Sequence, residues 1–206
     1  MHPNRRLNSA ESRFAQQLAG QVRKALTIIL TPGEDADQTP LRIERAEQAT
    51  APARLAAGQP GGDAARQKMQ SVYADCLVWY REHMQRYDAT DDDVGAAMAA
   101  FVSACMGAMQ GVQSAPGYRP GMDRQLSNVL RRHPLWTRAN AAERQTMFER
   151  FAILAVFVQG CAVRAVREGP KAVANVRQAG RSYLRELFGI DPDMLALGPC
   201  GLRVKD

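Results

Sequence analysis

The sequence contains few of the residues that enzymes most often use for chemistry. Only three of its 206 residues are histidines, and none lies at ligand or dyad spacing from a cysteine or carboxylate. The cysteines form no CxxC pair, which argues against a zinc site or a thioredoxin-type site. No P-loop, GxGxxG or GxSxG pattern occurs. We therefore expect no metal, no cofactor and no catalytic residue, although a site assembled in space from distant residues stays open.

Long apolar runs are also missing. The longest, Phe151 to Val158, is far shorter than the roughly 20 residues that a membrane-spanning helix needs. Near the N-terminus, Glu11, Arg13 and Arg23 interrupt any apolar core of a secretory signal. We therefore expect no membrane span and a cytoplasmic location by default, with export as the alternative.

Cysteine usage leaves the redox compartment open. An even count would allow two disulfides in an oxidising compartment. However, three of the four fall in apolar helical stripes, where a free cysteine behaves as a small buried hydrophobe, and we favour core packing for them. The four are Cys76, Cys105, Cys161 and Cys200.

The residues that are abundant favour helices. Hydrophobic residues make up 46% of the chain, aromatics only 6%, and alanine, the best helix former, is frequent. The sequence predicts an all-α protein: a compact bundle of about five helices with a separate N-terminal amphipathic helix. The net charge of +6 and the pI of about 9.5 permit contact with nucleic acid or an anionic surface without requiring it.

The chain divides into four parts by composition. Residues 1–31 predict a helix, with a capping box from Asn8 to Glu11 and one apolar face. Residues 32–62 are rich in proline and glycine and predict a linker, with a short helix from Leu41 to Ala49. The sequence predicts that residues 63–198 form the bundle and that residues 199–206 form a frayed tail. No segment shows the alternating pattern of a β-strand. The apolar face of the first part consists of Phe14, Leu18, Val22, Leu26 and Ile29.

Within the bundle, local signals mark the helix ends. Asp63 is a predicted N-cap, and Asn140 with Glu143 forms a second capping box. The segments 91–111 and 141–168 predict the central helices, because one is rich in small residues and the other is apolar on most sides. The three carboxylates of Asp91–Asp93 resemble a metal site, but a helix N-terminus explains them better, since acids there meet exposed N–H groups.

One basic row stands out among the polar residues. Arg177, Arg181 and Arg185 are spaced i, i+4 and i+8, so they share one helix face. Arg164 and Lys171 lie just upstream. Guanidinium groups in a row suit carboxylate or phosphate recognition, which makes this face a candidate surface for an anionic partner. The carboxylates Asp75 and Glu82, seven positions apart, are better explained as solvated surface charge.

From residue 66 to 202 the pattern resembles an uncharacterised bacterial family, known only as a domain of unknown function. The stretch Tyr80-Arg81-Glu82-His83-Met84, followed by Tyr87 to Ala97, is similar to a family segment that precedes an apolar helix. Residues 142–151 and 180–194 are similar to its closing helices. The resemblance implies an all-helical domain and supplies no catalytic residues. The resemblance also implies export, since many members of that family begin with an N-terminal signal, and this chain departs from that pattern.

The sequence is compatible with three functions. The first is a non-catalytic protein–protein interaction module, with a protein partner or self-association, because helix-packing signals are abundant and clustered chemical groups are not. The second is an anion- or nucleic-acid-binding protein that uses the arginine face; against nucleic acid, the row lacks interleaved aromatics and a helix-turn-helix signature. The third is an enzyme of unrecognised type, which would need a pocket with converging polar groups.

Overall fold

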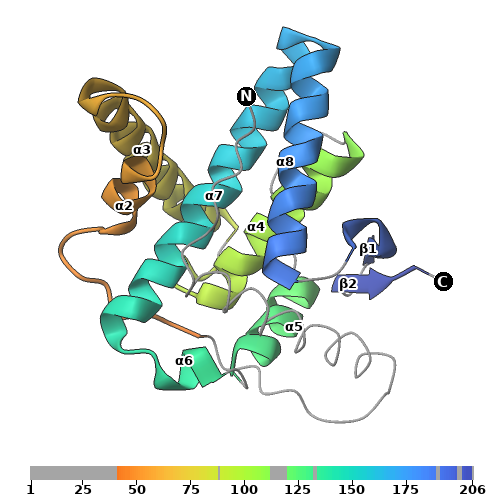
Figure 1. Ribbon diagram of the computed structural model, residues 1–206. Helices are drawn as coiled ribbons and strands as arrows, with labels where there is room; N and C mark the ends of the chain where they lie inside the picture. The colour runs from red at the N-terminus through yellow and green to blue at the C-terminus, as the bar shows by residue number, and fades with distance from the viewer. Residues whose placement is uncertain are drawn as a thin grey trace.

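The computed structural model describes residues 41–87, 89–111, 120–131, 134–188, 191–198 and 201–205. The predicted N-terminal helix lies outside these residues, as does Gly189, which the sequence predicts as a helix C-cap. The described part is almost entirely helical, with one short antiparallel hairpin (Figure 1). Its elements are α2 (Ala51–Ala57), α3 (Asp63–Arg86), α4 (Val94–Gln110), α5 (Pro120–Arg131), α6 (Pro134–Arg138), α7 (Ala141–Glu168), α8 (Pro170–Phe188), the 3₁₀ turn η1 (Pro192–Met194), β1 (Leu195–Gly198) and β2 (Gly201–Val204). The prediction of an all-α bundle is therefore confirmed.

The helices α4 and α7 form the centre of the bundle, as the sequence predicted. They pack along each other, with α3 against one side of α7 and α8 against both α7 and α4 (Figure 1). The buried side chains of α4 include Met98, Cys105 and Met106, none of which is exposed at all. Small residues on α4 let its neighbours come close, so this helix is covered on several sides.

Capping residues explain where the central helices begin and end. The Asp93 carboxylate accepts a hydrogen bond of 2.8 Å from the backbone N–H of Ala96 and so caps α4. Asn140 and Glu143 form the predicted capping box at the start of α7. At the other end of α4, Gly111 takes the left-handed conformation (φ +68°), which glycine adopts at low cost. The interpretation of Asp93 as part of a helix N-terminus is therefore confirmed. The prediction of Asp63 as an N-cap is wrong by one residue, because Gly62 is the N-cap and Asp63 is the first residue of α3.

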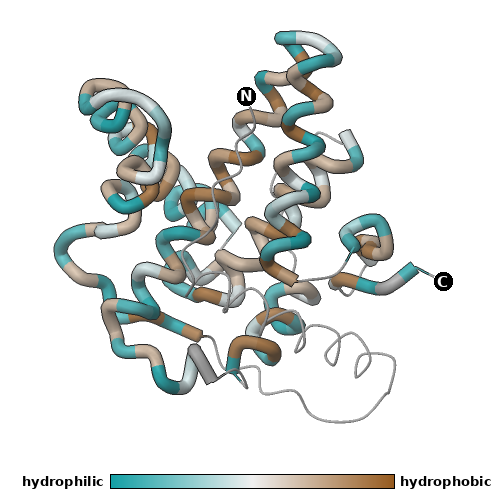
Figure 2. Tube along the Cα trace, in the orientation of Figure 1, coloured by the Kyte–Doolittle hydropathy of each residue, from teal (hydrophilic) through white to brown (hydrophobic). Residues whose placement is uncertain are grey.

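Among the described helices, α7 has the length and apolar composition of a membrane-crossing helix. The core helix of a soluble protein passes the same test. Figure 2 shows apolar residues along the middle of α7, where it lies among its neighbours. In this fold, α7 packs against α3, α4 and α8.

Residues 41–57, assigned to the linker from their composition, pack on the bundle. Leu41 and Ile43 are buried in the core, and the backbone around them pairs with residues 92–94. The predicted helix from Leu41 to Ala49 is wrong. A helix forms instead at Ala51–Ala57, where Pro52 suits the first turn because its missing N–H needs no partner there.

The C-terminal residues also differ from the prediction of a frayed, strand-free tail. Strands β1 and β2 pair in antiparallel register, with Leu195 opposite Val204 and Gly198 opposite Gly201. The side-chain amide of Gln125 on α5 holds β2 through two hydrogen bonds to the backbone of Leu202, at 2.9 and 2.7 Å. Leu195 and Leu202 are buried. Four residues are too few for an alternating pattern to show in the sequence.

Candidate functional site

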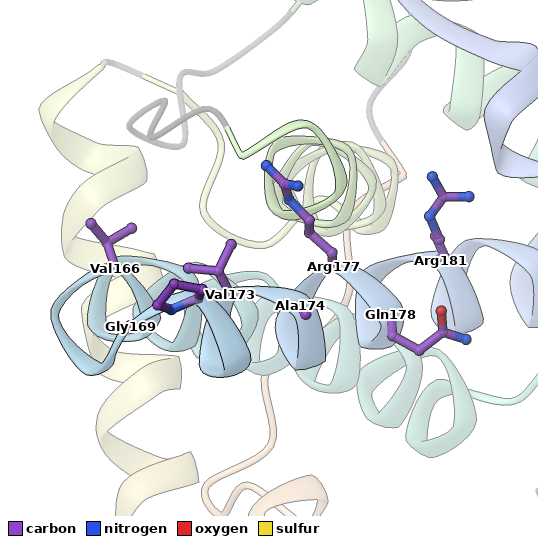
Figure 3. Close-up of a pocket in the computed structure, with 8 residues that line it drawn as sticks. Val166, Gly169, Val173, Ala174, Arg177, Gln178 and Arg181 are labelled. Carbon is purple, nitrogen blue, oxygen red and sulfur yellow. The ribbon is translucent and has the colours of Figure 1, made fainter.

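A groove of about 530 Å³ lies along α8 near its junction with α7 (Figure 3). It contains two of the five basic residues predicted to face an anionic partner, Arg177 and Arg181. The remaining lining is mostly apolar or small. The lining residues are Val166, Gly169, Pro170, Val173, Ala174, Arg177, Gln178 and Arg181.

The turn between α7 and α8 creates the base of the groove. Gly169 ends α7 with φ +105°, and its N–H bonds to the carbonyl of Ala165. Pro170 then starts α8, whose first turn needs no N–H at that position. Because only Gly169 separates the two helices, Val166 on α7 and Val173 on α8 line the same groove.

Arg177 reaches from α8 across the end of α4. In Figure 3, Arg177 and Arg181 extend to the same side of α8, and Arg177 crosses the last turn of α4. A Cβ atom on Gly111 would lie 2.5 Å from Nη2 of Arg177, so the guanidinium rests directly against that glycine. The C-terminal end of a helix carries partial negative charge. The end of α4 therefore stabilises the positive charge of Arg177 and orients its guanidinium group at the edge of the groove.

The other predicted basic residues differ in how far they are already engaged. Arg181 forms an ion pair with Asp193 of η1. Arg164 lies 3.9 Å from Glu168, one turn away on α7. Arg185 and Lys171 are exposed and make no ion pair with any residue that the structure describes. Arg177 and Arg185 are thus the cations of the α8 row that pair with no carboxylate among the described residues. Of the five predicted basic residues, Arg164, Lys171 and Arg185 do not line the groove.

The groove has an apolar floor that sequence reasoning did not identify. Val166 lines the groove and keeps 54% of its surface exposed. Val163 lies one turn earlier on α7, outside the groove, and keeps 39% exposed. In the sequence, the segment 141–168 is apolar on most sides, and that pattern singles out neither valine. Neighbouring exposed apolar residues beside a polar rim are typical of protein interaction sites. The available signal was that both valines fall off the main buried stripe of α7.

The groove offers charge and apolar contact, and none of the described residues that line it is placed to donate a proton to a substrate or to take one. Its polar members are two guanidinium groups and the amide of Gln178. Across the described ranges, no three histidine, cysteine or acidic side chains cluster so as to hold a metal ion. What this arrangement can do is recognise carboxylates or phosphates next to an apolar group.

Comparison with known proteins gives a family but no activity. Residues 5–205 match the model of a family described as a family of unknown function (DUF6683). No curated protein and no solved structure matches the chain.

Proposed function

Because the chain belongs to the DUF6683 family, whose function is unknown, we propose a function from the groove itself: a non-catalytic interaction module that binds an acidic segment of a protein partner along α8. The observation that carries this proposal is an apolar groove floor with Arg177 at its edge and the exposed Arg185 two turns farther along α8, neither of them paired with a carboxylate among the described residues.

The spacing of the two arginines suits a helical or extended acidic segment. They stand eight residues apart on α8, which corresponds to about 12 Å along the helix axis. A partner helix with carboxylates two turns apart could pair with both. Guanidinium–carboxylate pairs are directional, and each such bond is worth more than a neutral hydrogen bond.

The apolar floor favours a protein partner over a nucleic acid. An apolar side chain of the partner, placed beyond the carboxylate that meets Arg177 and on the side away from Arg185, would bury the exposed surface of Val166. Burial of apolar surface adds about 25 cal/mol per Å². A phosphate backbone offers no such group. The same arginines nevertheless support an anion- or nucleic-acid-binding function as the second candidate, which depends on charge alone.

The test compares two labelled probes on the full chain by fluorescence anisotropy. One is a synthetic helical peptide with glutamates two turns apart and a leucine one turn beyond the glutamate that would meet Arg177, with a scrambled peptide as its reference. The other is a single-stranded oligothymidine. We expect the ordered peptide to bind and Arg177→Glu/Arg185→Glu to weaken it roughly tenfold or more, since each tenfold is about 1.4 kcal/mol.

Two variants make the test specific. Lys68→Glu/Arg124→Glu changes the net charge equally at exposed positions on α3 and α5, and it should leave peptide affinity nearly unchanged. Val166→Ser should weaken the peptide but not the oligonucleotide. Equal loss in the two charge-reversal variants would contradict the proposal. Oligonucleotide binding that ignores Val166→Ser, with no peptide binding, would favour the second candidate.

A further inference from the structure

The outer side of α3 carries a row of aromatic and apolar side chains away from the groove, three of them exposed and His83 half-buried. Trp79 stacks on the His83 ring at a centroid distance of 4.7 Å, and His83 meets Tyr87 edge-on at 4.9 Å. Trp79 is 41% exposed, Tyr87 51% and Val78 55%. We call these four residues the α3 aromatic face.

This face is distinct from the part of α3 that holds the fold. Tyr73, Leu77 and Tyr80 point into the core and are nearly fully buried. The α3 aromatic face is therefore not needed to attach α3 to α7. Adjacent exposed large apolar side chains usually mark a surface that something else covers.

We propose that residues 9–31 of the same chain dock on the α3 aromatic face. Those residues lie outside the described part, and their sequence places apolar side chains at helical spacing. Such a stripe needs an apolar surface to cover it, and the α3 aromatic face supplies one. The stripe consists of Phe14, Leu18, Val22, Leu26 and Ile29.

The point where the described chain begins supports this occupant. Leu41 is fixed beside the start of α4, because its N–H donates to Asp93 and its carbonyl accepts from Val94. Arg45 and Gln85 both bond to Asp91, which ties this strand of chain to the C-terminal end of α3. The described chain therefore begins beside the segment that links the C-terminal end of α3 to α4.

The connection is long enough for docking. Residues 32–40 could span up to about 30 Å when extended. The distance along α3 from Trp79 to Tyr87 is only about 12 Å at the helical rise. The family match also begins at residue 5, so the segment belongs to the matched region together with the bundle.

Charge favours the α3 aromatic face over the groove as the docking site. Residues 1–31 contain five arginines and lysines against one glutamate. The groove presents arginines and would repel such a segment. Next to Val78 and Trp79, one turn to either side, lie Asp75 and Glu82, both exposed. These carboxylates complement Arg13, Arg23 and Lys24.

The experiment measures how readily acrylamide quenches Trp79 in the full chain. Trp136→Phe makes Trp79 the only tryptophan. In this background Leu18→Ser/Val22→Ser interrupts the apolar stripe at two of its five side chains, and we expect the quenching constant roughly to double as covered indole surface is freed. Gln16→Ser/Gln17→Ser, on the polar side of the same segment, should leave it unchanged. If Trp136→Phe lowers stability, the same comparison is made with Trp136 present, because its 7% exposure adds only a small constant background.

A second pair of variants tests the face itself. Asp75→Lys/Glu82→Lys should raise the quenching of Trp79 as Leu18→Ser/Val22→Ser does, whereas Asp63→Lys, at the far end of α3, should not. Identical quenching of Trp79 with and without the apolar stripe would overturn the proposal. Protection of Trp79 that disappears on dilution would also overturn it, because the segment would then cover a second copy. No groove residue is changed, so the result is independent of the proposed function.

Discussion

The carboxylate of Glu149 on α7 accepts a hydrogen bond of 2.9 Å from the backbone N–H of Ala51, 98 positions earlier in the chain. It accepts a second from the N–H of Thr50 at 3.0 Å and a third from the side-chain amide of Gln145 at 2.6 Å. Glu149 has no exposed surface. Thr50 makes no side-chain cap of its own, so a carboxylate from another helix satisfies the first N–H groups of α2.

Replacement of Glu149 by alanine should therefore destabilise the protein. It would leave the buried N–H of Ala51 and the partly buried N–H of Thr50 without an acceptor. We expect the free energy of unfolding to fall by about 2–4 kcal/mol. Urea denaturation followed by circular dichroism measures the change. Glu168→Ala, at an exposed position on the same helix, is the matched control and should cost less than about 0.5 kcal/mol. Equal midpoints for the two variants would show that the Glu149 contacts contribute nothing.

The acidic run Asp91–Asp93 should not respond to divalent cations. Asp93 uses one oxygen to cap α4 and the other to accept the N–H of Leu41 at 2.5 Å. Asp91 is paired with Arg45 and also bonded by Gln85. We expect calcium, magnesium or a chelator to leave the thermal midpoint of unfolding unchanged. A calcium-dependent rise that Asp91→Asn abolishes would count against this assignment.

These contacts explain which parts of the fold the sequence could predict. Asn140, Glu143 and Asp93 act on N–H groups within three residues of themselves, so capping patterns located α4 and α7. In contrast, α2 depends on Glu149 and β2 on Gln125, 98 and 77 residues away. Local composition gave no sign of either partner, and both segments were assigned as linker or tail.

The candidate site, too, could be predicted from the sequence only where it depends on local spacing. Spacing on one helix was sufficient to place Arg177, Arg181 and Arg185 on one face. The groove also depends on how α7 turns into α8 and on where α4 ends. The contact of Arg177 with Gly111 and the ion pair of Arg181 with Asp193 bring together residues from separate elements. For that reason, the sequence could not show that Arg181 is engaged while Arg185 is free.

We expect the protein to lose stability at alkaline pH, because ionisation of its buried thiol and phenol groups disfavours the folded state. Burial, with a smaller effect from Asp75, raises the pKa of Cys76 from 9.0 to about 11, and burial raises that of Tyr73 to about 12. A raised folded-state pKa favours the neutral form. Its stabilising effect is complete below the unfolded pKa and is lost as pH rises through the folded value. We expect the urea midpoint to fall between about pH 9 and 11, and to fall less in Cys76→Ala.

Thiol labelling provides the independent check on that interpretation. Iodoacetamide reacts with the thiolate, so at pH 8 Cys76 and the fully buried Cys105 should be alkylated far more slowly in the native protein than in urea. Mass spectrometry of the peptides measures each site separately. Burial also raises the pKa of Cys105. Rapid native alkylation of Cys76, or a pH slope that Cys76→Ala leaves unchanged, would contradict the prediction.

Two glycines in long helices should respond in opposite ways to the same substitution. A Cβ on Gly180 of α8 would lie 2.8 Å from the backbone oxygen of Cys105 on α4, a distance that real side chains do not reach. Gly180→Ala must push α8 away from α4, and we expect a loss of about 1–3 kcal/mol. On α7, Gly160 has no atom within 4 Å of an added Cβ and is exposed.

Gly160→Ala should therefore stabilise the protein, by about 0.5–1 kcal/mol, because alanine loses less backbone freedom than glycine in a helix. Both variants add one methyl group inside a helix, so helix propensity is the same for each and only the neighbouring helix differs. Urea midpoints that shift in the same direction would mean that α8 is free to move away from α4 at little cost. The close approach at Gly180 would then not fix the position of α8, the helix that carries Arg177 and Arg185.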